Sequence, residues 1–97
     1  MKNRLTFTYV LEFRGGTYCT QVKSESVNKS VIVWIEKLKE EKKEIRYLAD
    51  KTINEIELIV SHKDYIPVPL ERLENIWFTH YKTRQGSLLV NIIQTHI

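Results

Sequence analysis

The sequence contains few of the residues that cross-link a chain or interrupt its helices and strands. Its 97 residues include one cysteine, two prolines and three glycines. One cysteine excludes a disulfide within the chain, and this fits the reducing cytoplasm, where we expect the protein to act. No apolar run is long enough to span a bilayer as a helix. The first residues also lack the continuous apolar stretch of a signal peptide, because threonines alternate with apolar residues there.

A strong net charge is missing as well. The formal net charge is +3, and the hydrophobic and charged fractions of 42% and 28% are those of an ordinary globular protein. The length predicts a single domain over residues 1–97. The charge is uneven, since residues 1–24 carry +3, residues 25–74 carry −2 and residues 75–97 carry +2. The two ends are therefore basic, and the middle is slightly acidic.

Two strands and a tight turn are predicted at the start of the chain. Apolar and polar residues alternate over residues 5–13 and again over residues 17–24, which is the period of a strand with one buried face. Gly15 and Gly16 lie between these runs. A type I′ hairpin turn needs positive φ at both central residues, so the pair predicts a two-residue loop at Gly15–Gly16.

The same register bears on the only cysteine. It places Cys19 opposite Glu12, whose negative charge disfavours the reactive thiolate, so we expect Cys19 to be a small residue at a strand position. The glycine turn lacks the spacing of a phosphate-binding loop and does not precede a helix. We therefore interpret Arg14, beside it, as a solvated turn residue.

Two helices are predicted in the middle of the chain. Ser26 is a good N-cap, and the apolar stripe after it has helical spacing, so the first helix continues into the early forties. Thr52 and Glu55 have the spacing of a capping box, which predicts a second helix at about residues 53–62. The alternative for residues 45–60 is a strand, because β-branched residues are frequent there. The stripe of the first helix consists of Val27, Val31, Trp34, Ile35 and Leu38.

The last third predicts a second hairpin. Pro67 and Pro69 favour an extended segment, and a helical turn at residues 70–73 is an option. Residues 75–83 and 87–97 follow as two strands. Their register stays open between a two-residue Gln85–Gly86 loop and a three-residue loop that shifts the pairing by one.

Together these elements predict an α+β fold. The order β-β-α-α-β-β indicates a two-layer sandwich, in which an antiparallel sheet of about four strands, formed by two hairpins, carries two helices on one face.

Catalytic, metal and cofactor chemistry finds no support in the sequence. His62, His80 and His96 do not converge in either register, and no zinc-site spacing is present. No serine lies in a nucleophile elbow. We therefore predict no enzyme, no cofactor and no metal.

The C-terminal hairpin is apolar on both faces, which is unusual for a sheet covered on one side only. In the two-residue-loop register, one face carries Trp77, Tyr81, Val90 and Ile92. The other face mixes apolar and polar side chains, and an exposed patch of this kind is typical of a partner interface. The alternative is that the segment containing Pro67 and Pro69 wraps over it. The candidate interaction surface comprises Phe78, His80, Lys82, Arg84, Leu89, Asn91 and Ile93.

Two functions follow as hypotheses. The first is a small non-catalytic protein-binding module, such as an inhibitor, an immunity-type protein or an accessory protein, whose partner is another protein or a second copy. The alternative is nucleic-acid binding through the basic sheet layer, with Tyr18, Trp77 and Tyr81 as stacking surfaces.

Overall fold

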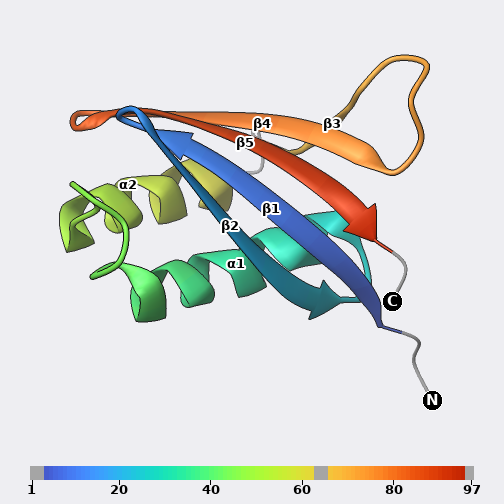
Figure 1. Ribbon diagram of the computed structural model, residues 1–97, viewed down its shortest axis with the longest axis horizontal. Helices are drawn as coiled ribbons and strands as arrows, with labels where there is room; N and C mark the ends of the chain where they lie inside the picture. The colour runs from blue at the N-terminus through green and yellow to red at the C-terminus, as the bar shows by residue number, and fades with distance from the viewer. Residues whose placement is uncertain (1–3, 63–65, 96–97) are drawn as a thin grey trace.

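The computed structural model describes residues 4–62 and 66–95 and shows an antiparallel sheet with two helices on one face (Figure 1). The strands lie in the order β2-β1-β5-β4-β3. The predicted α+β two-layer sandwich is confirmed, and a short fifth strand, β3, extends it. The elements are β1 (Leu5–Phe13), β2 (Gly16–Ser24), α1 (Val27–Glu41), α2 (Asp50–Ser61), β3 (Val68–Pro69), β4 (Ile76–Thr83) and β5 (Gly86–Thr95).

The turn between β1 and β2 is placed one residue earlier than predicted. Its loop is Arg14–Gly15, with φ of 49° and 85°, so Arg14 takes one of the two positive-φ positions for which the sequence predicts glycine. Gly16 begins β2, where any larger residue would require the Tyr18 ring to move. A Cβ there would lie 2.5 Å from the hydroxyl oxygen of Tyr18, whose ring lies beside it.

This turn moves the register of the hairpin by two residues. Val10 lies opposite Cys19, and Glu12 lies opposite Thr17, so the predicted Cys19–Glu12 pair is wrong. The predicted faces are nevertheless correct, because a shift of two residues leaves every side chain of a strand on the same side of the sheet.

The turn between β4 and β5 also differs from both predicted registers. The loop is Arg84–Gln85, and Tyr81 lies opposite Leu88 instead of Val90. Gly86, with φ of 133°, begins β5. The face assignment of the two-residue-loop register holds here too, for the same reason of parity.

Helix α1 forms as predicted. The Ser26 hydroxyl accepts a hydrogen bond from the backbone N–H of Lys29 at 3.2 Å, which satisfies one free donor of the first turn. Its buried face packs mainly under β2 and consists of Ser30, Val31, Trp34, Ile35 and Leu38.

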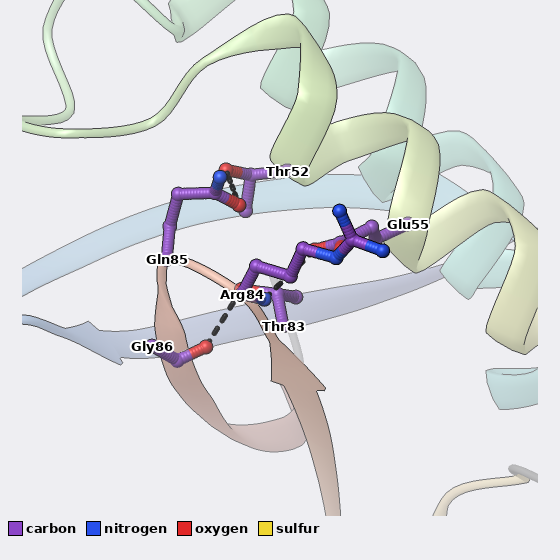
Figure 2. Close-up of polar contacts among 6 residues, drawn as sticks. All are labelled: Thr52, Glu55, Thr83, Arg84, Gln85 and Gly86. Carbon is purple, nitrogen blue, oxygen red and sulfur yellow. Dashed lines mark hydrogen bonds and ion pairs between the residues drawn. The ribbon is translucent and has the colours of Figure 1, made fainter.

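Helix α2 is confirmed as a helix, but its predicted start is wrong. It begins at Asp50 after Ala49, which makes no side-chain cap. Thr52 is buried, and its hydroxyl donates to the Oε1 atom of Gln85 at 3.0 Å (Figure 2). Glu55 also accepts a hydrogen bond from the β4–β5 turn, through the backbone N–H of Arg84. The two residues of the predicted capping box therefore bind this turn and do not cap α2.

The segment after α2 joins the edge of the sheet. Val68 and Pro69 pair with β4 as β3, in agreement with the predicted extended conformation. The option of a helical turn at Leu70–Leu73 takes the form of a turn, closed by a hydrogen bond of 3.2 Å from Leu73 N to Leu70 O. No helix among the described residues is long and apolar enough to cross a membrane.

The core is centred on three stacked aromatic rings. Trp34 of α1 stacks against both Tyr9 and Tyr81, with ring centroids 4.9 Å and 6.2 Å away. All three side chains are fully buried. Large rings at the centre of a small domain bury much apolar area, so this stack stabilises the packing of α1 on the sheet.

Candidate interaction surface

The candidate surface is the side of the sheet turned away from α1 and α2, which we call the open face (Figure 1). Strand residues point alternately to the two faces, and the helices cover only one of them. The side chains of the open face are Thr6, Thr8, Val10, Glu12, Thr17, Cys19, Gln21, Lys23, Val68, Ile76, Phe78, His80, Lys82, Ser87, Leu89, Asn91, Ile93 and Thr95.

An apolar cluster extends over the open face from β1 to the edge strand β3, with Asn91 between Val10 and Phe78. The register aligns one row across all five strands, and Val10, Phe78 and Val68 belong to it. Ile76 and Ile93 form a directly opposed pair in the next row. Leu89 adds a side chain that is 37% exposed, whereas Val68 is 59% exposed.

Six of the seven predicted surface residues lie on the open face: Phe78, His80, Lys82, Leu89, Asn91 and Ile93. Phe78 and Asn91 are directly opposed, as are His80 and Leu89. Arg84 is the exception. It lies in the β4–β5 loop, where its backbone N–H donates to the Glu55 Oε2 atom at 3.1 Å and its Nε lies 3.7 Å from Oε1 (Figure 2).

The predicted surface lacks three members of the apolar cluster, of which Ile76 shares β4 with Phe78, whereas Val10 and Val68 lie on other strands. Alternation over residues 5–13 places Val10 on the polar side of the first hairpin, where it is the single apolar residue beside Thr6, Thr8 and Glu12. Val68 lies between two prolines, which concealed a strand of two residues. Neither residue could be connected with Phe78 before the strand order was known.

The opposite face of the C-terminal hairpin is the buried one. Tyr81, Val90 and Ile92 are fully buried under the helices, and Trp77 contacts Phe7 edge-to-face at 6.0 Å. The alternative in which the proline segment wraps over the hairpin is not observed, since Val68–Pro69 extends the sheet beside β4. Asp64 and Tyr65, which also belong to that segment, lie outside the described residues.

The two hairpin tips contact each other through Arg14. Its Nη1 donates to the backbone carbonyl of Gln85 at 3.0 Å, and its guanidinium lies 4.3 Å from the ring centroid of Tyr47. The prediction of a merely solvated Arg14 is therefore wrong. Arg14 and Arg84 both have structural partners, and among the described strand residues Lys23 and Lys82 are the lysines and arginines on the open face.

The aromatic residues considered for base stacking point into the protein. Tyr81 is fully buried, and burial raises its pKa above the usual range. The Tyr18 hydroxyl accepts a hydrogen bond from the Arg46 backbone N–H at 3.2 Å. Trp77 packs against the core. Phe78 is the one phenylalanine, tyrosine or tryptophan that the described strands place on the open face, where His80 also lies.

Potential metal ligands stay apart. His62 follows the last turn of α2, His80 lies on the open face, and His96 lies outside the described residues. Cys19 is an exposed free cysteine on β2. Within residues 4–62 and 66–95, no three histidine, cysteine or acidic side chains gather closely enough to hold a metal ion.

A second apolar feature lies on the helical layer. A groove of about 550 Å³ between α1 and α2 is lined mainly by Val31, Ile32, Ile35, Val60 and Ile66. Lys39 links the two helices at its rim, with Nζ 2.8 Å from Glu36 Oε2 and 3.3 Å from Glu57 Oε2. These hydrogen bonds, the one to Glu36 most, raise the pKa of Lys39.

Comparison with known proteins gives no relative from which a site could be transferred: no family model, no curated protein and no solved structure matches the chain. The candidate surface therefore rests on its own geometry.

Proposed function

We propose that this protein is a small non-catalytic protein-binding module that contacts another protein through its open face. An inhibitor, an immunity-type protein or an accessory protein would act in this way. The observation that supports the proposal is the apolar cluster around Phe78, which lies on the side of the sheet that neither helix covers. Apolar centres with polar rims are typical of protein interfaces.

The polar residues of the open face agree with this role. Glu12 and Lys82 lie toward the hairpin tips, and Lys23 lies at the other end of β2, so the cluster has a rim with charges of both signs. Nucleic-acid binding has less support, because the tyrosines point inward and the two tip arginines are engaged. The cytoplasm is the compartment we propose, since a single cysteine needs no oxidising environment.

The proposal is tested by affinity capture with matched charge substitutions. Phe78→Lys places a charge in the apolar cluster, whereas Leu58→Lys places one on α2, where Leu58 is 63% exposed and far from the open face. We expect a protein captured by the wild type and by Leu58→Lys to be lost with Phe78→Lys. Circular dichroism must show that both variants are folded. Equal capture by the two variants would contradict a role for the open face.

A further inference from the structure

The edge of the sheet formed by β2 carries a second inference, which concerns a different surface from the open face of the proposed function. The two edges of the sheet differ. At one edge, β3 is two residues long and includes Pro69, which has no N–H to donate. At the other edge, β2 runs for nine residues without a proline. Native proteins shorten, charge or cover the edges that must not pair, and β2 is left long and regular.

The outward polar groups of β2 belong to its odd-numbered residues. Phe13 and Gly16 flank the two-residue loop as a hydrogen-bonded pair, and such pairs recur at every second position of an antiparallel ladder. Even-numbered residues of β2 therefore bond to β1. The other backbone groups point away from the sheet, and within residues 4–62 and 66–95 none of them hydrogen bonds to another segment. These exposed residues are Thr17, Cys19, Gln21 and Lys23.

We propose that two copies of the chain pair their β2 strands antiparallel, about a two-fold axis perpendicular to the sheet. Full overlap of the strands sets Thr20 opposite its own copy, Cys19 opposite Gln21 of the partner subunit, and Thr17 opposite Lys23 of the partner subunit. In this register the outward residues face one another, so their free N–H and C=O groups exchange hydrogen bonds. The sheet becomes continuous across both copies.

The side chains of β2 are self-complementary in the same register. On the inner face, Tyr18 lies opposite Val22 of the partner subunit, and Thr20 lies opposite Thr20 of the partner subunit. Aromatic with β-branched residues and threonine with threonine are favourable cross-strand pairs. Lys23, the one charged residue of the strand, lies opposite a threonine and not opposite its own copy. This complementarity favours a second copy over an unrelated strand.

Helix α1 adds a second contact between the two copies, below the paired β2 strands. Val33, Lys37 and Glu41 are four residues apart, so they share one flank of the helix. Glu41 lines a small cavity together with Tyr18 and Cys19, which places this flank under β2. Val33 is 39% exposed there. The two-fold axis brings this flank beside the same flank of the partner subunit, with an apolar side chain and charges of both signs.

The dimer is tested first by removing one outward N–H. Proline is tolerated at an edge position whose N–H faces away from the sheet, so Gln21→Pro blocks pairing while the hairpin can persist. Gln21→Ala is the matched control, because it keeps the N–H. Light scattering after size exclusion is expected to give twice the chain mass of 11.6 kDa for the wild type and Gln21→Ala, and that mass itself for Gln21→Pro. A wild type that stays monomeric, or a folded Gln21→Pro dimer, overturns the proposal.

Cysteine pairing tests the register even if Gln21→Pro does not fold. Opposed residues of a hydrogen-bonded antiparallel pair have Cα atoms about 5.5 Å apart, within the range of a disulfide. Oxidised glutathione should therefore link Gln21→Cys to Cys19 of the partner subunit and give a dimer on a non-reducing gel. Glu12→Cys, equally exposed but on β1, should remain a monomer. Equal cross-linking of the two variants, or cross-linking of neither, contradicts the register.

Phe78→Lys separates this inference from the proposed function. Phe78 lies on the open face and not at the β2 edge, so the edge dimer should persist when partner capture is lost. A dimer that Phe78→Lys dissociates and Gln21→Pro does not would place self-association on the open face and overturn the edge proposal.

Discussion

The hydroxyl oxygen of Tyr9 lies 2.6 Å from the hydroxyl oxygen of Ser30, in a buried contact between β1 and α1. Ser30 donates its own proton to the Val27 carbonyl at 2.6 Å, so Tyr9 is the donor in the pair. The contact fixes the helix against the sheet at the side of the aromatic stack, where Tyr9 lies against Trp34.

Ser30→Ala should destabilise the protein more than the loss of one hydroxyl suggests. It leaves the buried Tyr9 hydroxyl without its acceptor, and an unsatisfied buried polar group costs about 1–3 kcal/mol. Tyr9→Phe removes the donor instead and leaves Ser30 bonded to Val27. The double variant should therefore cost less than the sum of the two single variants. Urea unfolding followed by tryptophan fluorescence measures all three, and simple additivity would contradict the pairing.

Alkaline pH should weaken the fold through the same tyrosine. Burial raises the pKa of Tyr9 far above its ordinary value of 10.0, so the folded protein keeps a neutral phenol that the unfolded chain ionises. This contribution of Tyr9 to the free energy of unfolding is fully present below pH 10.0. Above pH 10.0 it falls by about 1.4 kcal/mol per pH unit. The free energy of unfolding of Tyr9→Phe should fall less steeply above that pH. Urea unfolding at a series of pH values measures both proteins, and equal slopes for the wild type and Tyr9→Phe would contradict this role of Tyr9.

Glu55→Ala should destabilise the protein more than Arg84→Ala, although the two side chains form one ion pair. The Arg84 side chain is 91% exposed, so Arg84→Ala removes only a solvated ion pair and should cost less than about 0.5 kcal/mol. Glu55→Ala also removes the acceptor of the Arg84 backbone N–H and should cost about 1–2 kcal/mol. Thermal unfolding compares the two, and hydrogen exchange at the Arg84 amide should accelerate only with Glu55→Ala. Similar costs for both variants would show that the backbone contact is weak.

The faces of the strands could be predicted from the sequence, whereas their registers could not. Alternation assigns Tyr9 to the core for either two-residue turn, because a slip of two residues preserves the side. Phe78 lies on the open face as in the predicted two-residue-loop register, because the actual β4–β5 loop also has two residues. Which two residues form the turn depends on the energy difference between the Arg14–Gly15 and Gly15–Gly16 loops, and the local sequence does not reveal that difference. Arg14 adopts a positive φ because its guanidinium gains the Gln85 carbonyl and the Tyr47 ring, and these partners come from distant segments.

Tertiary contacts also explain the wrong start of α2 and the partial prediction of the candidate surface. Thr52 and Glu55 match a capping box by spacing. Their side chains instead form hydrogen bonds with Gln85 and Arg84 of the β4–β5 turn, so they do not cap the helix. The sequence predicts Arg84 on the surface because the residue is charged. It does not reveal that Glu55 of α2 is the partner of Arg84. Val10 and Val68 join Phe78 only through the strand order, which places the first hairpin and the proline segment on either side of the C-terminal one.

Gly16 should prove sensitive to substitution because of one neighbouring ring. A Cβ at this position would lie 2.5 Å from the Tyr18 hydroxyl oxygen and 2.7 Å from its Cζ, so Gly16→Ala must displace the ring and break its hydrogen bond to the Arg46 N–H. We expect a cost of about 1–3 kcal/mol, typical of overpacking. In a Tyr18→Val background the same substitution should be nearly neutral in thermal unfolding, because the ring is absent. With Tyr18 present, Gly16→Ala should change the Arg46 amide shift by NMR, because the hydrogen bond to the hydroxyl is lost. Gly15→Ala is the contrast, because its Cβ meets open space but its φ of 85° strains any L side chain, so it should cost about 1–2 kcal/mol in both backgrounds. A Gly16→Ala cost that does not depend on Tyr18 would show that backbone conformation, and not the ring, selects glycine there.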